Sequence, residues 1–252
     1  MKDLLVVYPH GLGDCILLTP AIREFHRITG HKVHIATLER FRSARFFYNN
    51  PHVDEIYFTK DPWHDYENER VGFPALYNEW KTIAQKNYMG GLVMPMHHRP
   101  ESKIALNFQY LGIRGNHNIK TEFHTTHDDV EIANNIIRDL VGDKDFGFIQ
   151  TYAGFKPKDL PENFGREWLA QNKGLENFIE IGKDLDAFSC NINVQFEILR
   201  RSSAVCLTDS VFYHACHAMD KEVDYAYFAR GESVYNRVRP LHEVKEHVTY
   251  KI

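Results

Sequence analysis

Short apolar runs alternate with amphipathic stretches along the first hundred or so residues of the chain. The apolar runs at 4–8, 32–38, 54–59 and 91–96 have the length and composition of buried strands. The stretches at 15–29, 39–48, 75–87 and 101–111 repeat their apolar positions with the period of a helix. Strands and helices that alternate in this way predict a mainly parallel sheet with helices on both faces.

The same pattern returns in the second half of the chain after a looser segment. We expect a helix at 128–140, strands at 146–152, 178–181, 204–207 and 223–228, and helices that end near 171, cover 194–202 and begin at 210. The two halves together predict an α/β fold of two Rossmann-like, doubly wound lobes that face a central cleft. We place the boundary near Val141, which gives domains at 1–140 and 141–252.

The composition is that of a folded globular protein, with 252 residues, 43% hydrophobic content and a formal net charge of −4 at pH 7. This charge argues against a protein that coats nucleic acid through bulk electrostatics. No apolar run approaches the roughly 20 residues that a membrane-spanning helix needs. Residues 1–3 lead into a strand, so we expect a cytoplasmic protein without stable membrane insertion. Four cysteines form no CxxC pair and are expected as buried thiols: Cys15, Cys190, Cys206 and Cys216.

Three motifs follow one another in the order in which one enzyme family carries them. They are GDCILLTPAI at 13–22, NPHVDEI at 50–56 and TDSVFYHACHA at 208–218. Together they resemble the heptosyltransferases of glycosyltransferase family 9, and the resemblance covers most of the chain. It implies a GT-B fold and metal-independent transfer of a sugar from a nucleotide-diphosphate sugar to a hydroxyl acceptor, a saccharide or a glycolipid core. The first lobe would then face the acceptor and the second would bind the donor, with the nucleotide sugar as co-substrate and no further cofactor.

Asp14 is the candidate catalytic residue. It follows the first strand where a helix is expected to begin, a position at which a carboxylate can cap unpaired backbone amides. The resemblance implies that Asp14 is instead the general base that takes the proton of the acceptor hydroxyl. Gly11 and Gly13 have no third glycine in register and form no dinucleotide fingerprint. We expect them to let the loop turn tightly and bring acceptor and carboxylate together.

The candidate donor site follows the strand at 204–207. Ser210 and the amides after it lie at a predicted helix N-terminus, where unpaired N–H groups and the helix dipole favour a phosphate. His214, one turn along, can donate a hydrogen bond to the same diphosphate. A plain helix cap and a packed helical histidine are the simpler interpretations. Thr208 belongs to the same motif, and Asp209 is assigned to loop ordering or to a sugar hydroxyl because its charge would repel a phosphate.

Two further basic residues, Lys156 and Lys158, lie in the loop after the strand at 146–152. The resemblance implies that a cation in this loop neutralises the leaving diphosphate, and a solvated charged loop is the simpler interpretation. The chain departs from the family at Val211, where the family carries glycine. A valine there is expected to obstruct close approach of the backbone to a diphosphate. The histidine pairs lack the spacing of a zinc site, so no metal site is predicted.

The segment 40–48 supplies an alternative. Arg40 and Arg42 lie among aromatic residues, and such a pattern can grip phosphates and stack on bases. In that case the acceptor would be a hydroxymethylated base of DNA, as for phage DNA glycosyltransferases. The simpler interpretation is an amphipathic helix with Phe41 and Phe46 inward. A second alternative is a non-catalytic module that binds a sugar nucleotide without turnover, for which Val211 is the main argument.

Overall fold

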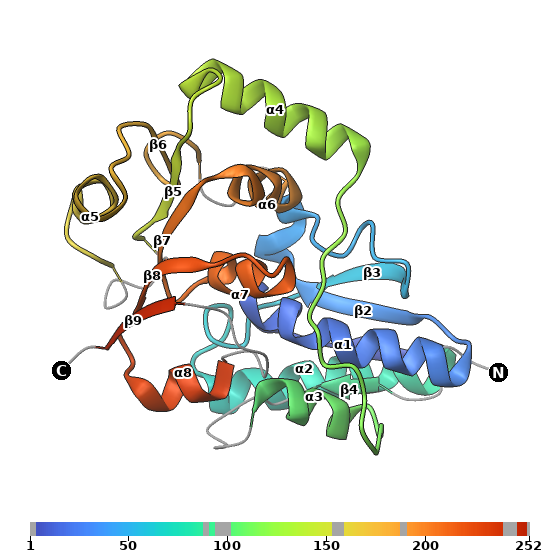
Figure 1. Ribbon diagram of the computed structural model, residues 1–252. Helices are drawn as coiled ribbons and strands as arrows, with labels where there is room; N and C mark the ends of the chain where they lie inside the picture. Colours follow the sequence, from blue (N-terminus) through green and yellow to red (C-terminus); the bar gives the residue numbers. More distant parts are fainter. Residues whose placement is uncertain are drawn as a thin grey trace.

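A computed structural model describes residues 4–87, 91–93, 102–152, 159–186, 191–238 and 246–250. Two parallel sheets with helices packed on them form the molecule (Figure 1). This arrangement confirms the predicted fold class of two Rossmann-like lobes. Within the described residues, no helix combines the length and the apolar character that crossing a membrane requires.

The first sheet has four parallel strands in the order β3-β2-β1-β4. Its strands are β1 (Leu4–Val7), β2 (Val33–Leu38), β3 (Val53–Thr59) and β4 (Gly91–Val93). Helices α1 (Leu12–Thr29), α2 (Glu69–Asn87) and α3 (Lys103–Tyr110) connect or follow them. The strand order reverses between β1 and β4, and ligands of open α/β sheets bind at such a reversal, outside the carboxyl ends of the strands.

The second sheet has five parallel strands in the order β6-β5-β7-β8-β9. Its strands are β5 (Gly147–Gln150), β6 (Phe178–Glu180), β7 (Ala204–Thr208), β8 (Val223–Phe228) and β9 (Glu246–Tyr250). Its helices are α4 (His127–Val141), α5 (Phe164–Lys173), α6 (Ile192–Arg201), α7 (Val211–Ala218) and α8 (Glu232–Val238). The order reverses between β5 and β7, and α7 starts at the carboxyl end of β7.

The predicted helix over residues 39–48 is wrong. The chain forms a short 3₁₀ helix, η1 (Glu39–Ala44), which ends at Arg45 in the left-handed region with a φ of 54°. Phe46 and Phe47 follow in a turn, and both are buried. The left-handed backbone of Arg45 cannot continue a helix, so the chain turns before it reaches these rings. The turn places both in the core.

The two lobes share one hydrophobic core. A single cluster of buried side chains joins Leu17 and Ile104 of the first lobe to Phe212 and Tyr213 of the second. Helix α1 packs against α7, and α8 returns to contact α3. Helix α4, which precedes the boundary predicted near Val141, packs on α6 of the second lobe (Figure 1). The three described cysteines are buried free thiols, as expected, and Cys190 lies outside the described residues.

A proline inside α1 is compensated by the residue before it. Pro20 lacks an N–H, so the carbonyl of Ile16 loses its usual partner in the helix. The hydroxyl of Thr19 donates to that carbonyl at 2.7 Å. The Thr-Pro step of the first motif therefore keeps α1 helical through its buried middle.

Candidate functional site

Asp14 lies in the first turn of α1, at the carboxyl end of β1 and beside the reversal of strand order. The helix begins at Leu12 with Gly11 as its N-cap, so Asp14 is not the cap residue. Its side chain forms an ion pair with the ammonium group of Lys103, the first residue of α3. These residues follow β1 and β4, the two strands between which the order reverses. Lys103 was not predicted, because 89 positions separate it from Asp14 and it belongs to none of the three motifs.

Buried polar groups hold this corner of the first lobe. The hydroxyl of Tyr8 donates to the backbone carbonyl of Asp14 at 3.1 Å and faces the side chain of Asn107. The amide of Asn107 in turn donates to the carbonyl of Leu17 at 2.9 Å. Both side chains are fully buried. The contacts fix α3 against α1, and with it the distance between the Lys103 and Asp14 side chains.

The charges around Asp14 set its protonation. Burial by itself would raise the pKa of Asp14, but the positive charge of Lys103, a nearby His10, the hydrogen bond from Lys103 and His214 together lower it to about 2. The carboxylate is therefore ionised at neutral pH. The Asp14 carboxylate is a weak base while Lys103 stays paired with it.

His214 connects the second lobe to this carboxylate. It lies in α7, buried, and its ring packs on the backbone of Gly13. A Cβ on Gly13 would lie 2.6 Å from Cδ2 of His214, so only glycine allows this approach. Neither Gly11 nor Gly13 has a positive φ. These glycines therefore provide no left-handed turn, and at Gly13 a side chain is excluded by the contact with His214. Their role in bringing the acceptor to the carboxylate stays a prediction.

The N-terminus of α7 offers unpaired donors. Ser210 is its N-cap, as predicted, but its side chain makes no capping hydrogen bond. The hydroxyl oxygen of Ser210 is buried and has no hydrogen-bond partner among the described residues. A helix N-terminus beside a hydroxyl group that has no hydrogen-bond partner is suited to bind a phosphate group.

The residues before Ser210 connect β7 to β8. The Thr208 hydroxyl donates to the carbonyl of Tyr227 at 3.3 Å, and the Asp209 carboxylate lies 3.2 Å from the guanidinium of Arg230. Both Thr208 and Asp209 are buried. These contacts order the loop that leads into α7. Lys156 and Lys158, the other predicted donor residues, lie outside the described residues.

Val211 is the first residue of α7, and its side chain is buried in the core. Its φ is negative, so the valine side chain causes no backbone strain there. Its α-carbon lies 3.6 Å from the position that a Cβ on Gly13 would take. Gly13 of α1 lets α1 and α7 approach closely at this contact. The family motif instead places its glycine at the position of Val211, on α7.

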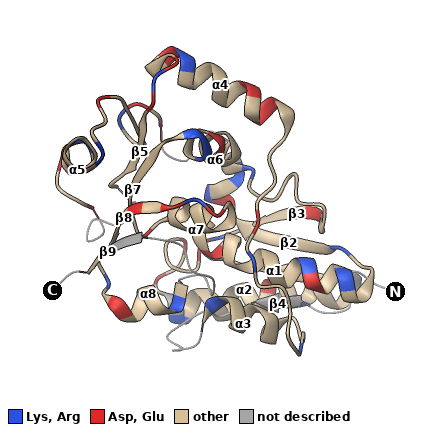
Figure 2. Cartoon of the chain, in the orientation of Figure 1, with Lys and Arg blue, Asp and Glu red and all other residues tan. Residues whose placement is uncertain are grey.

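Arg40 and Arg42 are paired with acidic residues. The guanidinium of Arg42 donates two hydrogen bonds, each of 2.7 Å, to the carboxylate of Glu39. The same guanidinium stacks 3.9 Å above the ring centre of Phe58. Arg40 lies 3.2 Å from Asp61. Figure 2 shows basic and acidic positions mixed along α1 and α8. Along the described ranges, no group of three or more His, Cys, Asp or Glu side chains is placed to hold a metal ion.

An aromatic cluster, formed by His10, Trp63 and Phe73, approaches Asp14 through His10. The ring of His10 is 5.6 Å from that of Trp63 and 6.2 Å from that of Phe73. Trp63 and Phe73 pack edge to face at 5.1 Å and are half-buried. The cluster therefore combines a buried imidazole near the carboxylate with two partly exposed rings.

No protein-family profile matches the chain, and no curated protein matches it by sequence. Solved structures do match it along nearly its whole length. A glycosyl transferase family 9 protein from Veillonella parvula superposes with a TM-score of 0.69 at 11% identity, over 99% of this chain and 86% of the other. The E. coli ADP-heptose lps heptosyltransferase II gives 0.63 at 15% identity, over 98% and 90%. The E. coli heptosyltransferase WaaC, solved with ADP-2-deoxy-2-fluoro heptose, gives 0.56 at 12%, over 98% and 92%. The resemblance predicted from the motifs is thus confirmed for the fold.

Proposed function

We propose that the chain is a glycosyltransferase that moves a sugar from a nucleotide-diphosphate sugar to a hydroxyl acceptor. The observation that carries this proposal is the meeting of the two helix N-termini, with the Asp14 carboxylate on α1 beside His214 of α7. A base from one lobe and an anion-binding helix end from the other are the two parts that such a transfer needs. The shared fold with glycosyltransferases supports the same reaction class.

In this proposal the donor diphosphate lies at the N-terminus of α7. Its oxygens accept hydrogen bonds from the free backbone amides and from the Ser210 hydroxyl. Lys156 and Lys158 add positive charge from the loop after β5, and His214 contributes a further donor. Because one neighbour, WaaC, was solved both with ADP and with ADP-2-deoxy-2-fluoro heptose, ADP-linked sugars are the first donors to test.

Asp14 acts on the acceptor. As the acceptor oxygen attacks the anomeric carbon, its proton passes to Asp14 and the bond from the sugar to the diphosphate breaks, with the electron pair leaving on the phosphate oxygen. The ion pair with Lys103 keeps the base ionised. Displacement of Lys103 by the acceptor would raise the pKa of Asp14 and make it a stronger base.

The acceptor side favours a saccharide. The half-buried rings of Trp63 and Phe73 offer apolar faces beside His10, whose charge acts on the proposed base. Arg40 and Arg42, on which the DNA alternative depends, are held by Asp61 and Glu39. A non-catalytic module is the remaining alternative, but its main argument is weakened because the side chain of Val211 is buried in the hydrophobic core.

Titration calorimetry with ADP, UDP and their sugars tests the proposal directly. We expect one nucleotide diphosphate to bind, and His214→Ala and Lys156→Ala each to weaken it by about 1–3 kcal/mol, the range for a lost charged hydrogen bond. Added EDTA should leave transfer intact. Binding of no nucleotide sugar by the wild type would refute the enzyme proposal. Binding without transfer to any acceptor would support the non-catalytic module.

A further inference from the structure

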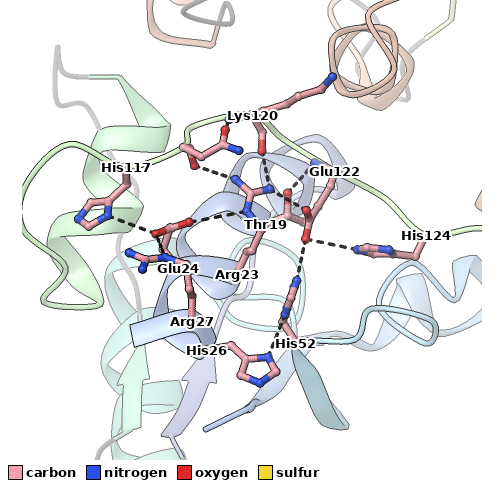
Figure 3. Close-up of polar contacts among 11 residues, drawn as sticks. Thr19, Arg23, Glu24, His26, Arg27, His52, His117, Lys120, Glu122 and His124 are labelled. Atoms are coloured by element: carbon pink, nitrogen blue, oxygen red, sulfur yellow. Dashed lines mark hydrogen bonds and ion pairs between the residues drawn. The ribbon is translucent and has the colours of Figure 1, made fainter. Parts of the chain in front are cut away.

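The interlobe linker, residues 114–126, is attached along the far half of α1. Arg23 binds it at three points (Figure 3): its guanidinium donates to the carbonyls of Asn118 at 2.7 Å and Lys120 at 2.9 Å, and to the carboxylate of Glu122 at 2.6 Å. The side chain of Arg23 is only 18% exposed. All three contacts fix the chain just before it enters the second lobe.

Glu122 is the centre of this attachment. Its backbone N–H donates to the hydroxyl of Thr19 at 3.0 Å, the same hydroxyl that compensates Pro20. One carboxylate oxygen lies 3.3 Å from Nε2 of His124 and 3.5 Å from Nε2 of His52 (Figure 3). Burial would raise the pKa of Glu122, but hydrogen bonds with His124 and Arg23 and their charges lower it. The carboxylate therefore stays ionised through mild acid.

The same linker is bound to the second lobe at its far end. The hydroxyl of Thr125 donates to Glu197 of α6 at 3.0 Å, and Lys120 pairs with Asp220 after α7. Thr126 caps α4 in a capping box with Asp129. Release of the linker from α1 would thus loosen the connection between the lobes without breaking either sheet.

A pair of histidines, His26 of α1 and His52, lies beside the contact between the linker and α1. Nδ1 of His26 lies 2.9 Å from Nδ1 of His52 (Figure 3). Such a contact needs one ring nitrogen to donate and the other to accept. Because Nε2 of His52 faces the Glu122 carboxylate, we assign the proton of neutral His52 to Nε2 and the shared proton to His26. If only His52 gains a proton, the contact can persist because His26 can change tautomer and accept through its Nδ1. If both rings are protonated, the Nδ1–H groups of His26 and His52 point at each other and the hydrogen bond is lost.

We propose that His26 and His52 form an acid-sensitive latch, which holds the interlobe linker against α1 and releases it when both rings are protonated. The proposal does not depend on the enzymatic function. It rests on the geometry of the histidine pair, on the shared carboxylate and on the position of the linker between the lobes.

The other charges facing the pair do not remove this effect. On α1, Glu24 is engaged by Arg27 at 2.7 Å and by His117 of the linker at 3.3 Å. Burial is the largest effect on His52 and lowers its pKa; Glu122 raises it, and His26, His124 and Arg23 lower it further.

The sign of the effect follows from that lowered pKa. A histidine with a lowered pKa in the closed state stabilises that state while it is neutral. This stabilisation is present above the ordinary value of about 6.5 and is lost as the pH falls toward the lowered value. Glu122 cannot cause a loss in this window because its own pKa is below the ordinary carboxyl value.

Solvent has access to the pair. A pocket of about 820 Å³ lies beside it, and both histidines line it with Arg23, Arg27 and His117. Protons and water can therefore reach the latch without unfolding of the core. The pocket also gives the released His52 ring a hydrated position.

Amide hydrogen exchange of the full chain tests the latch. Rates for residues 118–124 are compared at about pH 7.5 and about pH 5.5, on either side of the ordinary histidine pKa, after correction for intrinsic exchange. In the wild type we expect protection of these amides to fall by about tenfold or more at the lower pH, while β5 and β7 stay protected. His52→Gln, which cannot be protonated, should show no such difference.

His64→Gln is the matched control, because His64 is exposed and outside the linker network. It should behave as the wild type. His26→Gln removes the second ring and should abolish the pH difference as well, which keeps the test valid if His52→Gln fails to fold. Equal protection of the wild-type linker at both pH values would overturn the proposal. So would an undiminished loss of protection in His52→Gln or His26→Gln.

Discussion

The ring of His214 packs on the backbone of Gly13, so the first turns of α1 and α7 touch across the two lobes. A Cβ on Gly13 would lie 2.6 Å from Cδ2 and 3.1 Å from Nε2 of that ring. The contact places a titratable group of the second lobe beside Asp14 of the first. A side chain at position 13 therefore requires the His214 ring or the two helix ends to shift.

Gly13→Ala tests this contact. We expect it to destabilise the protein by about 1–3 kcal/mol, the usual cost of overpacking, and to lower turnover because the lobes separate at the site. In the double variant with His214→Ala the two losses of stability should not add, since the clash needs both groups. Denaturant unfolding of the two single variants and the double variant measures this coupling.

Gly11→Ser is the control for stability. A Cβ on Gly11 meets Asp14 at 3.6 Å, an ordinary contact, and serine is a favoured N-cap. Its free energy of unfolding should remain within about 0.5 kcal/mol of the wild type. An equal loss at both glycines would show that the helix start, rather than the contact with His214, requires glycine.

Asp14→Asn removes the proposed base while keeping the shape of the side chain. We expect turnover to fall by about 10²-fold or more, the scale of a lost general base, with little change in donor affinity. Initial rates and nucleotide titrations on the same preparation separate the two effects. Turnover close to that of the wild type would leave Asp14 with only a structural role.

Lys103→Met tests how the neighbouring ammonium group sets the pKa of Asp14. Removal of the ammonium charge leaves burial as the largest influence, so the pKa of Asp14 should rise from about 2. A carboxylate with a higher pKa is protonated at higher pH, and the acid limb of the kcat/KM profile should therefore move up in pH. Lys103→Arg keeps the charge and should keep the limb near its wild-type position. No movement in the methionine variant would contradict the assignment.

Much of the fold could be predicted because both sheets are parallel and several of their strands are buried. The fully buried strands β1, β2, β5 and β7 are largely apolar runs, which the sequence shows directly. Two elements had no such signal: α8 is short and largely polar, and of the β9 side chains that the structure describes, the half-buried Val248 packs on the core. The aromatic and basic segment after β2 was assigned to the wrong element because it has apolar residues at helical spacing, and Arg45 ends the helix early.

The candidate site was predictable only where its residues belong to motifs. Asp14, Ser210 and His214 follow strands that end at the reversals of strand order. Lys103 belongs to no motif and reaches Asp14 only through the packing of α3 on α1. The role of Gly13 was equally hidden, because its partner is 201 positions away in the other lobe.

The Thr-Pro step in α1 makes a separate prediction about stability. Thr19→Val leaves the buried carbonyl of Ile16 without a donor and should cost about 1–3 kcal/mol. Pro20→Ala restores a backbone N–H to that carbonyl, so the double variant should recover part of the loss. Thr29→Val is the control, because its hydroxyl donates to Phe25 in a stretch of helix without proline. A cost at Thr29 as large as that at Thr19, or no recovery in the double variant, would contradict this account.

The paired arginines lead to the last prediction. Arg42→Gln and Arg40→Gln should leave affinity for the nucleotide diphosphate unchanged, because Arg42 is engaged by Glu39 and Arg40 by Asp61. A protein that grips DNA through these residues would instead bind duplex DNA with an affinity that falls steeply with salt, and each variant would reduce that slope by about one. We expect no salt-dependent duplex binding by the wild type in fluorescence anisotropy. Duplex binding that both variants weaken would make a hydroxymethylated base the acceptor to test first.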